Sequence, residues 1–218
     1  MGTSLRERQA DQVRVAVLEG VISELEEKAA DEVSMADIAR SAGVALRTLY
    51  RYFPDRSSLL HAAGEHLYGS LGVPFDIAGP EDISASFLDA ARRLSIRPEL
   101  TRALVRTTAG RATRSAVRGQ RIEAIRAALK SVTDDLDADT AQWATAVIAH
   151  LCSAASWVNI TDESGLDEAD AQRAVAWAID ALISTLPDAS RPRRGVRTAH
   201  EQPHLPTPTQ PPTQRRFR

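Results

Sequence analysis

The chain has 218 residues, of which 43% are hydrophobic, so it can bury a sizeable core in one large domain or two small ones. A single cysteine, Cys152, excludes an intramolecular disulfide framework and a multi-cysteine zinc site, which favours the reducing cytoplasm as the location. The formal net charge of −2 averages an acidic body, −8 over residues 1–188, and a basic tail, +6 over residues 189–218.

A first amphipathic helix is predicted over residues 5–29, where apolar side chains recur at helical spacing (Val13, Val17, Val21 and Leu25). The same segment carries charges where a signal peptide would need its apolar core. We therefore expect a structural helix and no secretory leader.

Two short helices are predicted next, joined by a tight turn. Ser34 followed by Asp37 resembles a capping box, and Gly43 suits the positive φ that commonly ends a helix. A second short helix over residues 45–53 follows, and then a longer helix with Asp55 or Ser57 as its N-cap. Two short helices at a glycine turn form the helix-turn-helix arrangement, whose second helix enters the DNA major groove.

The second short helix is predicted to turn Leu49 and Phe53 to the core, with Leu46 near them. Its opposite side carries the predicted DNA contacts: Arg47, Thr48, Tyr50, Arg51 and Tyr52. Ser34 and Arg56 are predicted to bind adjacent phosphates. A solvated arginine face is the alternative interpretation of the same residues.

The stretch "DIARSAGVALRTLYRYFPDRSSLL", which follows a long helix, resembles the tetracycline-repressor (TetR) family of bacterial regulators over about residues 10–60. This resemblance implies contacts to bases or phosphates from four residues: Arg47, Thr48, Tyr50 and Tyr52. It also places Arg56 where the family usually has a phosphate-binding lysine. Ala45 replaces a frequent capping serine or threonine, and Leu46 replaces a commonly small or polar residue, so we expect a less firmly held start of the recognition helix.

The chain is predicted to be all-α, with a DNA-binding domain and linking helix at residues 1–71, an effector-binding and dimerisation domain at residues 72–188, and a tail at residues 189–218. The domain boundary rests on the turn-rich stretch "GVPFDIAGP". Further helices are predicted over residues 81–95, 97–110 and 113–136, with Pro98 and Gly110 as breaks. The tail has six of the eleven prolines, and we expect it to be disordered and to contact phosphates without choosing the operator.

Residues 140–161 contain no charged side chain, which predicts one helix buried on nearly every side. A membrane span is the alternative, disfavoured by polar residues within the run and by the lack of a basic flank. The next helix, over residues 165–186, has a narrow apolar stripe with small residues. By the resemblance, these last two helices pair with their copies as a four-helix bundle, which implies a homodimer; an intramolecular helix pair is the alternative.

A ligand pocket is predicted around an aromatic and histidine stripe of the uncharged helix and around residues of earlier helices. The candidates are Phe87, Leu104, Arg106, Trp143, Val147, His150 and Trp157. Ordinary core packing is the alternative for the stripe, and a surface salt bridge is the alternative for Arg106. Apolar walls with few polar groups suit a small, mainly hydrophobic ligand, including one that carries an acid group.

An enzyme is disfavoured, because the chain has no nucleophile elbow, phosphate-binding glycine loop or zinc-protease motif. His150 and Cys152 face different ways on a helix, and His61, Glu65 and His66 are explained as surface residues, so no metal or other cofactor is expected. The predicted function is a dimeric transcriptional regulator, released from a near-palindromic double-stranded operator by a small molecule. An architectural DNA-binding protein without effector is the second hypothesis.

Overall fold

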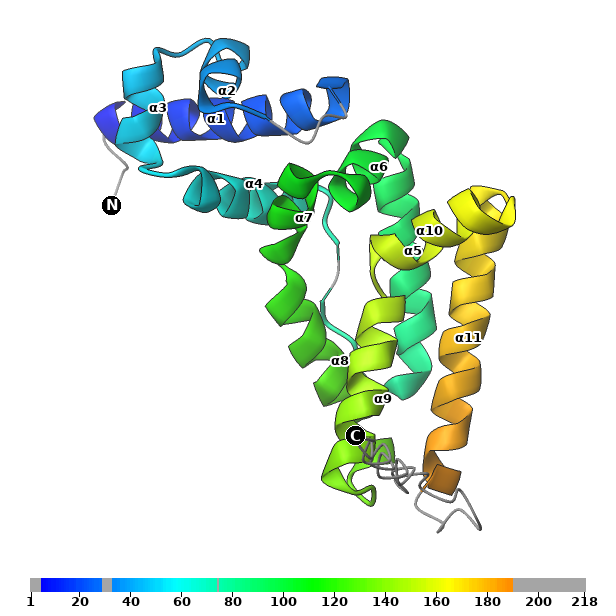
Figure 1. The fold of residues 1–218 in the computed structure, drawn as a ribbon. Helices are drawn as coiled ribbons and strands as arrows, with labels where there is room; N and C mark the ends of the chain where they lie inside the picture. Colours follow the sequence, from blue (N-terminus) through cyan, green and yellow to red (C-terminus); the bar gives the residue numbers. More distant parts are fainter. Residues whose placement is uncertain (1–4, 29–32, 74, 190–218) are drawn as a thin grey trace, which may run out of the picture.

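The computed structural model describes residues 5–28, 33–73 and 75–189, and these residues form helices and loops with no strand. The all-α prediction is confirmed. Figure 1 shows a small unit of three helices, α1 (Leu5–Lys28), α2 (Met35–Ser41) and α3 (Leu46–Tyr52), from which α4 (Arg56–Ser70) leads to a larger bundle. Of the tail predicted at residues 189–218, Ala189 is the last residue of the C-terminal helix, and residues 190–218 lie outside the described residues.

Local signals explain the small unit. The Ser34 hydroxyl caps α2 by accepting a hydrogen bond from the Asp37 backbone N–H at 3.1 Å. Gly43 adopts φ +67° in the turn, a conformation that favours glycine. Asp55 caps α4 by accepting from the Ser58 N–H at 2.8 Å, whereas Ala45 provides no side-chain cap for α3. These features agree with the predictions from the sequence.

The larger bundle begins after the loop that follows Leu71. It contains a 3-10 turn, η1 (Pro80–Asp82), and seven helices: α5 (Ile83–Ser95), α6 (Pro98–Arg106), α7 (Thr108–Ser115), α8 (Arg118–Thr133), α9 (Ala138–Leu151), α10 (Ala154–Ser164) and α11 (Glu168–Ala189). α5, α8, α9 and α11 run side by side, and α6 and α7 lie at the end of the bundle that faces α4 (Figure 1). One continuous hydrophobic core joins both units.

Gly110 is not a helix break, contrary to the prediction. It lies inside α7, which begins after Thr107, whose hydroxyl accepts from the Gly110 N–H at 2.9 Å. A Cβ at Gly110 would lie 2.1 Å from the Ala103 carbonyl oxygen. Glycine is therefore required here by the close packing of α7 on α6, rather than by a turn.

The uncharged stretch at residues 140–161 is not one helix, which is a second correction. It is split at Cys152 and Ser153 into α9 and α10, which meet at a bend of 65°. The Ser156 hydroxyl donates a hydrogen bond to the Leu151 carbonyl at 2.6 Å and so stabilises the break. No single described helix is long and apolar enough to cross a membrane, although α9 and α10 together pass the length and composition criteria as a bent pair.

The stretch is also not buried on nearly every side. Trp143 is 64% exposed and Val147 is 49% exposed, and the two side chains lie one turn apart on the outer side of α9. Trp177 on α11 is 73% exposed. Within one chain, these large apolar side chains are exposed to solvent.

The small unit and α4 contact the bundle at two places. α4 packs on α7 so closely that a Cβ at Gly64 would lie 2.1 Å from the Thr113 carbonyl oxygen. α1 contacts α6, where Arg97 at the start of α6 donates from Nε to Glu26 at 3.2 Å and forms an ion pair with the same carboxylate. α4 is also tied to α1 by a His66–Glu19 contact of 2.6 Å.

Candidate DNA-binding face and ligand cavities

The exposed side of α3 carries Arg47, Tyr50 and Arg51. It is presented to solvent because Leu49 and Phe53 on the opposite side are fully or nearly fully buried. Thr48 and Tyr52 are half-buried, and the Arg51 guanidinium lies 5.2 Å from the centre of the Tyr52 ring. Two arginines one helical turn apart can reach base edges or phosphates together.

Leu46 belongs to this exposed side, which corrects the prediction that it lies near the core. Its side chain is 41% exposed, one helical turn before Tyr50, which is 47% exposed. Apolar side chains in a major groove can contact the thymine methyl group. The face therefore combines positive charge with an apolar end.

Ser34 and Arg56 both have structural partners in this structure. The Ser34 hydroxyl donates to the Asp37 carboxylate at 2.7 Å besides capping α2. Arg56 Nε donates to the Val33 carbonyl at 3.1 Å and so joins the start of α4 to the residues before α2. The phosphate-binding role of both residues stays a prediction.

Residues 17–63 match the family model described as "Bacterial regulatory proteins, tetR family". They cover the second half of α1, all of α2 and α3, and the first half of α4. This segment is a TetR-family domain. The TetR-family resemblance predicted from the sequence is thereby confirmed for the part of the chain that carries the helix-turn-helix.

Comparison with individual proteins agrees with the TetR assignment. A stretch of 67 residues is 33% identical to the HTH-type transcriptional repressor LfrR of Mycolicibacterium smegmatis, and the match covers 31% of this chain and 34% of that protein. The chain thus matches about a third of this relative's length. A crystal structure of a TetR transcriptional regulator from Rhodococcus sp. RHA1 has a TM-score of 0.51 at 24% identity, covering 80% of this chain and 97% of that one. This similarity shows that the same fold extends over the helices of the larger bundle.

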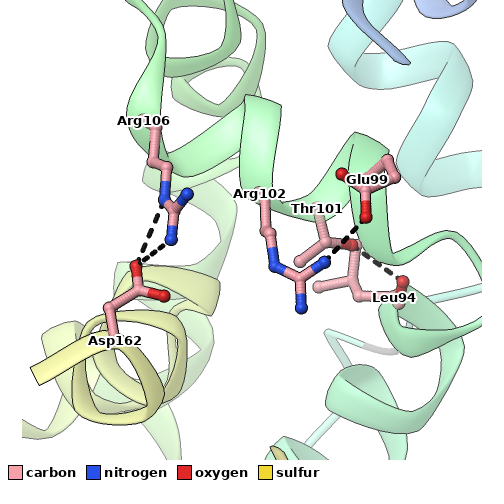
Figure 2. A network of polar contacts seen from close by, with 6 residues as sticks. All are labelled: Leu94, Glu99, Thr101, Arg102, Arg106 and Asp162. Carbon is pink, nitrogen blue, oxygen red and sulfur yellow. Dashed lines mark hydrogen bonds and ion pairs between the residues drawn. The ribbon is translucent and has the colours of Figure 1, made fainter. Parts of the chain in front are cut away.

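The predicted ligand-binding residues do not meet at one cavity. Trp143 and Val147 are exposed on α9, whereas Leu104 and Trp157 are buried in the core. Arg106 on α6 forms an ion pair with Asp162 on α10 (Figure 2). The distance between Nη2 and Oδ2 is 2.5 Å. Of the seven, His150 lines a cavity of about 560 Å³ and Phe87 lines a separate cavity of about 40 Å³. The ligand-binding role of the set stays a prediction.

Two neighbouring cavities lie against α8. The larger one, of about 560 Å³, is between α8 and α9 and is lined by Arg118, Arg121, Gln142 and His150 among others. The smaller one, of about 40 Å³, is apolar and is enclosed by α4, α5, α8 and the loop before η1. Arg121 lines both cavities.

The sequence reasoning missed the arginines of α7 and α8. Arg111, Arg114, Arg118 and Arg121 recur at intervals of three or four residues, which is the spacing of one helix face. This spacing could have indicated a cluster of positive charge. It was overlooked because the segment also has the pattern of an ordinary amphipathic helix.

The described residues contain no group of three or more His, Cys, Asp or Glu side chains that could hold a metal ion. His61 and Glu65 are both exposed, with 3.7 Å between the ring nitrogen and the carboxylate. Cys152 is half-buried at the end of α9, and burial raises the pKa of its thiol to about 12. A thiol of such high pKa is poorly suited to nucleophilic catalysis.

Cys152 is therefore expected to resist alkylation in the folded protein. At about pH 8, a thiol with this pKa is ionised in roughly one molecule in ten thousand. We expect iodoacetamide to react at least about a hundredfold more slowly with native protein than with urea-unfolded protein, where the pKa returns to about 8.5. Mass spectrometry of the time course measures both rates, and equal rates would contradict the assigned burial.

Proposed function

We propose that the protein is a dimeric, ligand-responsive transcriptional regulator that binds operator DNA through α3 and acts as a repressor. The single observation that carries this proposal is the exposed face of α3, with Arg47, Tyr50 and Arg51 set on a TetR-family domain. Repression is supported by the relative named as a transcriptional repressor. The location would then be the cytoplasm, where operator DNA is accessible.

A homodimer through α9 and α11 is part of this proposal. The exposed Trp143, Val147 and Trp177 side chains form apolar area on these two helices, and such area is typical of an interface between copies. A two-fold dimer would set two copies of α3 about 34 Å apart, on successive major grooves of a near-palindromic site. We propose this interface role for Trp143 in place of a pocket role.

Ligand release requires a connection between the bundle and α3, and α4 supplies it. α4 begins beside α3 and packs on α7 through Gly64. A ligand changes DNA affinity only if it binds the DNA-competent and released conformations with different affinity. We propose that a small, mainly hydrophobic ligand shifts α4, changes the spacing of the two α3 helices, and leaves the dimer intact.

Arg47→Ala is expected to weaken binding to the preferred operator by about 1–3 kcal/mol and to relax one base position. Arg47 is exposed on α3, and arginine makes bidentate contacts to guanine. Selection of the genomic DNA fragments that the protein binds identifies the operator. Binding titrations on matched and mismatched duplexes then measure the loss of affinity and the change in base preference.

Arg92→Ala is the control, because this exposed arginine pairs with Asp89 on α5, away from α3 and from the proposed interface on α9 and α11. Its operator affinity should equal that of the wild type. If Arg47→Ala kept both the affinity and the base preference of the wild type, its assigned role would be lost. If the wild type bound all DNA sequences with equal affinity, the result would favour an architectural DNA-binding protein instead.

A further inference from the structure

Three arginines at the junction of α7 and α8 have unbalanced charge. Arg126 and Arg106 pair with Glu123 and Asp162, respectively. No carboxylate among the described residues forms an ion pair with Arg114, Arg118 or Arg121. Their guanidinium groups therefore have no acidic partner among the described residues.

Two of these charges are also partly withdrawn from water. Burial is the main cause that lowers the pKa of Arg114 and of Arg121, and repulsion from Arg118 lowers both further. Arginine nonetheless stays charged in proteins. Arg114 Nε donates to the Leu104 carbonyl and Arg121 Nε to the Ala149 carbonyl, each at 3.2 Å, which holds the side chains in place. A held, partly buried cation is strongly stabilised by an anion that reaches it.

The two cavities give such an anion access. Arg118 and Arg121 line the larger cavity together with His150 and Gln142, which can donate further hydrogen bonds. Arg126 lines it as well, but its charge is matched by Glu123. Arg121 also borders the smaller cavity, whose other walls include Tyr68, Phe75 and Phe87. The polar and apolar compartments thus meet at one side chain.

We infer that this is the binding site of an organic anion with an apolar tail, whose anionic group pairs with Arg118 and Arg121 and whose tail enters the cavity beside Tyr68. The inference deepens the proposed function, because it assigns the effector a chemical class and a place. A neutral ligand would leave both guanidinium groups without a counter-ion.

The geometry also connects the site to α4. The smaller cavity, at about 40 Å³, has room for roughly three water molecules. A longer alkyl chain or a ring fits only if the walls move, and those walls include Tyr68 on α4 and Phe75 in the loop that follows it. Entry of the tail therefore displaces the end of α4, the helix that leads back to α3.

The test uses decanoate and decanol, which share an alkyl chain and differ in charge, at neutral pH and below the concentrations at which they aggregate. Isothermal titration calorimetry on the full chain should show decanoate binding at least about tenfold more tightly than decanol, because a charge-assisted contact adds this much or more. Arg121→Gln and the more exposed Arg118→Gln should each weaken decanoate about tenfold and leave decanol unchanged. Arg102→Gln, which removes an exposed arginine paired with Glu99, should bind decanoate as the wild type does.

Any one of three results would overturn the inference. The two probes could bind with equal affinity, neither probe could bind, or both Arg118→Gln and Arg121→Gln could bind decanoate as tightly as the wild type does. Because Arg118 is exposed, its variant remains informative if Arg121→Gln fails to fold. Operator binding by the ligand-free wild type is measured separately. If it binds no operator, the proposed function fails, while the calorimetry still decides whether the anion site exists.

Discussion

Gly64→Ala is expected to destabilise the folded protein by about 3 kcal/mol, the range of severe overpacking. Gly64 lies where α4 crosses α7, and a Cβ would lie 2.1 Å from the Thr113 carbonyl oxygen and 2.8 Å from the Ala116 Cβ. Neither the backbone oxygen nor the Ala116 methyl group can rotate away, so the two helices must separate. Urea unfolding followed by circular dichroism measures the loss as a lower midpoint.

Gly69→Ala is the matched control on the same helix. A Cβ at Gly69 meets nothing within 4 Å, and alanine favours helix by up to about 1 kcal/mol over glycine. This variant should be as stable as the wild type or slightly more stable. Equal midpoints for Gly64→Ala and Gly69→Ala would show that α4 and α7 do not approach as closely as described.

Trp177→Arg is expected to raise the dissociation constant of the homodimer by about a thousandfold. A tryptophan at an interface commonly contributes 2 kcal/mol or more, and a two-fold interface contains it twice, for about 4 kcal/mol in total. The side chain is 73% exposed within one chain, so the substitution should leave the fold of each subunit unchanged. Sedimentation equilibrium over a range of protein concentrations measures the constant.

The control for the dimer is Val15→Arg, which places the same charge at an exposed apolar residue of α1. It should self-associate as the wild type does. A wild type that stays monomeric, or a Trp177→Arg variant that associates normally, would contradict the interface on α9 and α11. Loss of operator affinity together with loss of the dimer would connect the interface to DNA binding, because each half-site alone is bound weakly.

Short-range signals were sufficient to predict the DNA-binding unit. The cap at Ser34, the left-handed Gly43 and the cap at Asp55 act within a few residues of their own positions, so their effects can be read from neighbouring letters. The apolar period of the first helix likewise specified its buried side. The family motif in this region rests on the same local physics.

Long-range packing decided the features that the sequence reasoning missed. Gly110 looks like a break until α6 is seen to approach it, and Leu46 looks like a core residue until α3 is seen to leave it exposed. A helix wheel shows which residues share a side but not what covers that side, so it could not separate the exposed Trp143 from the buried Trp157. The charges of Arg118 and Arg121 lack an acidic partner because no described carboxylate is folded next to them, and only the tertiary structure brings the two arginines to a cavity.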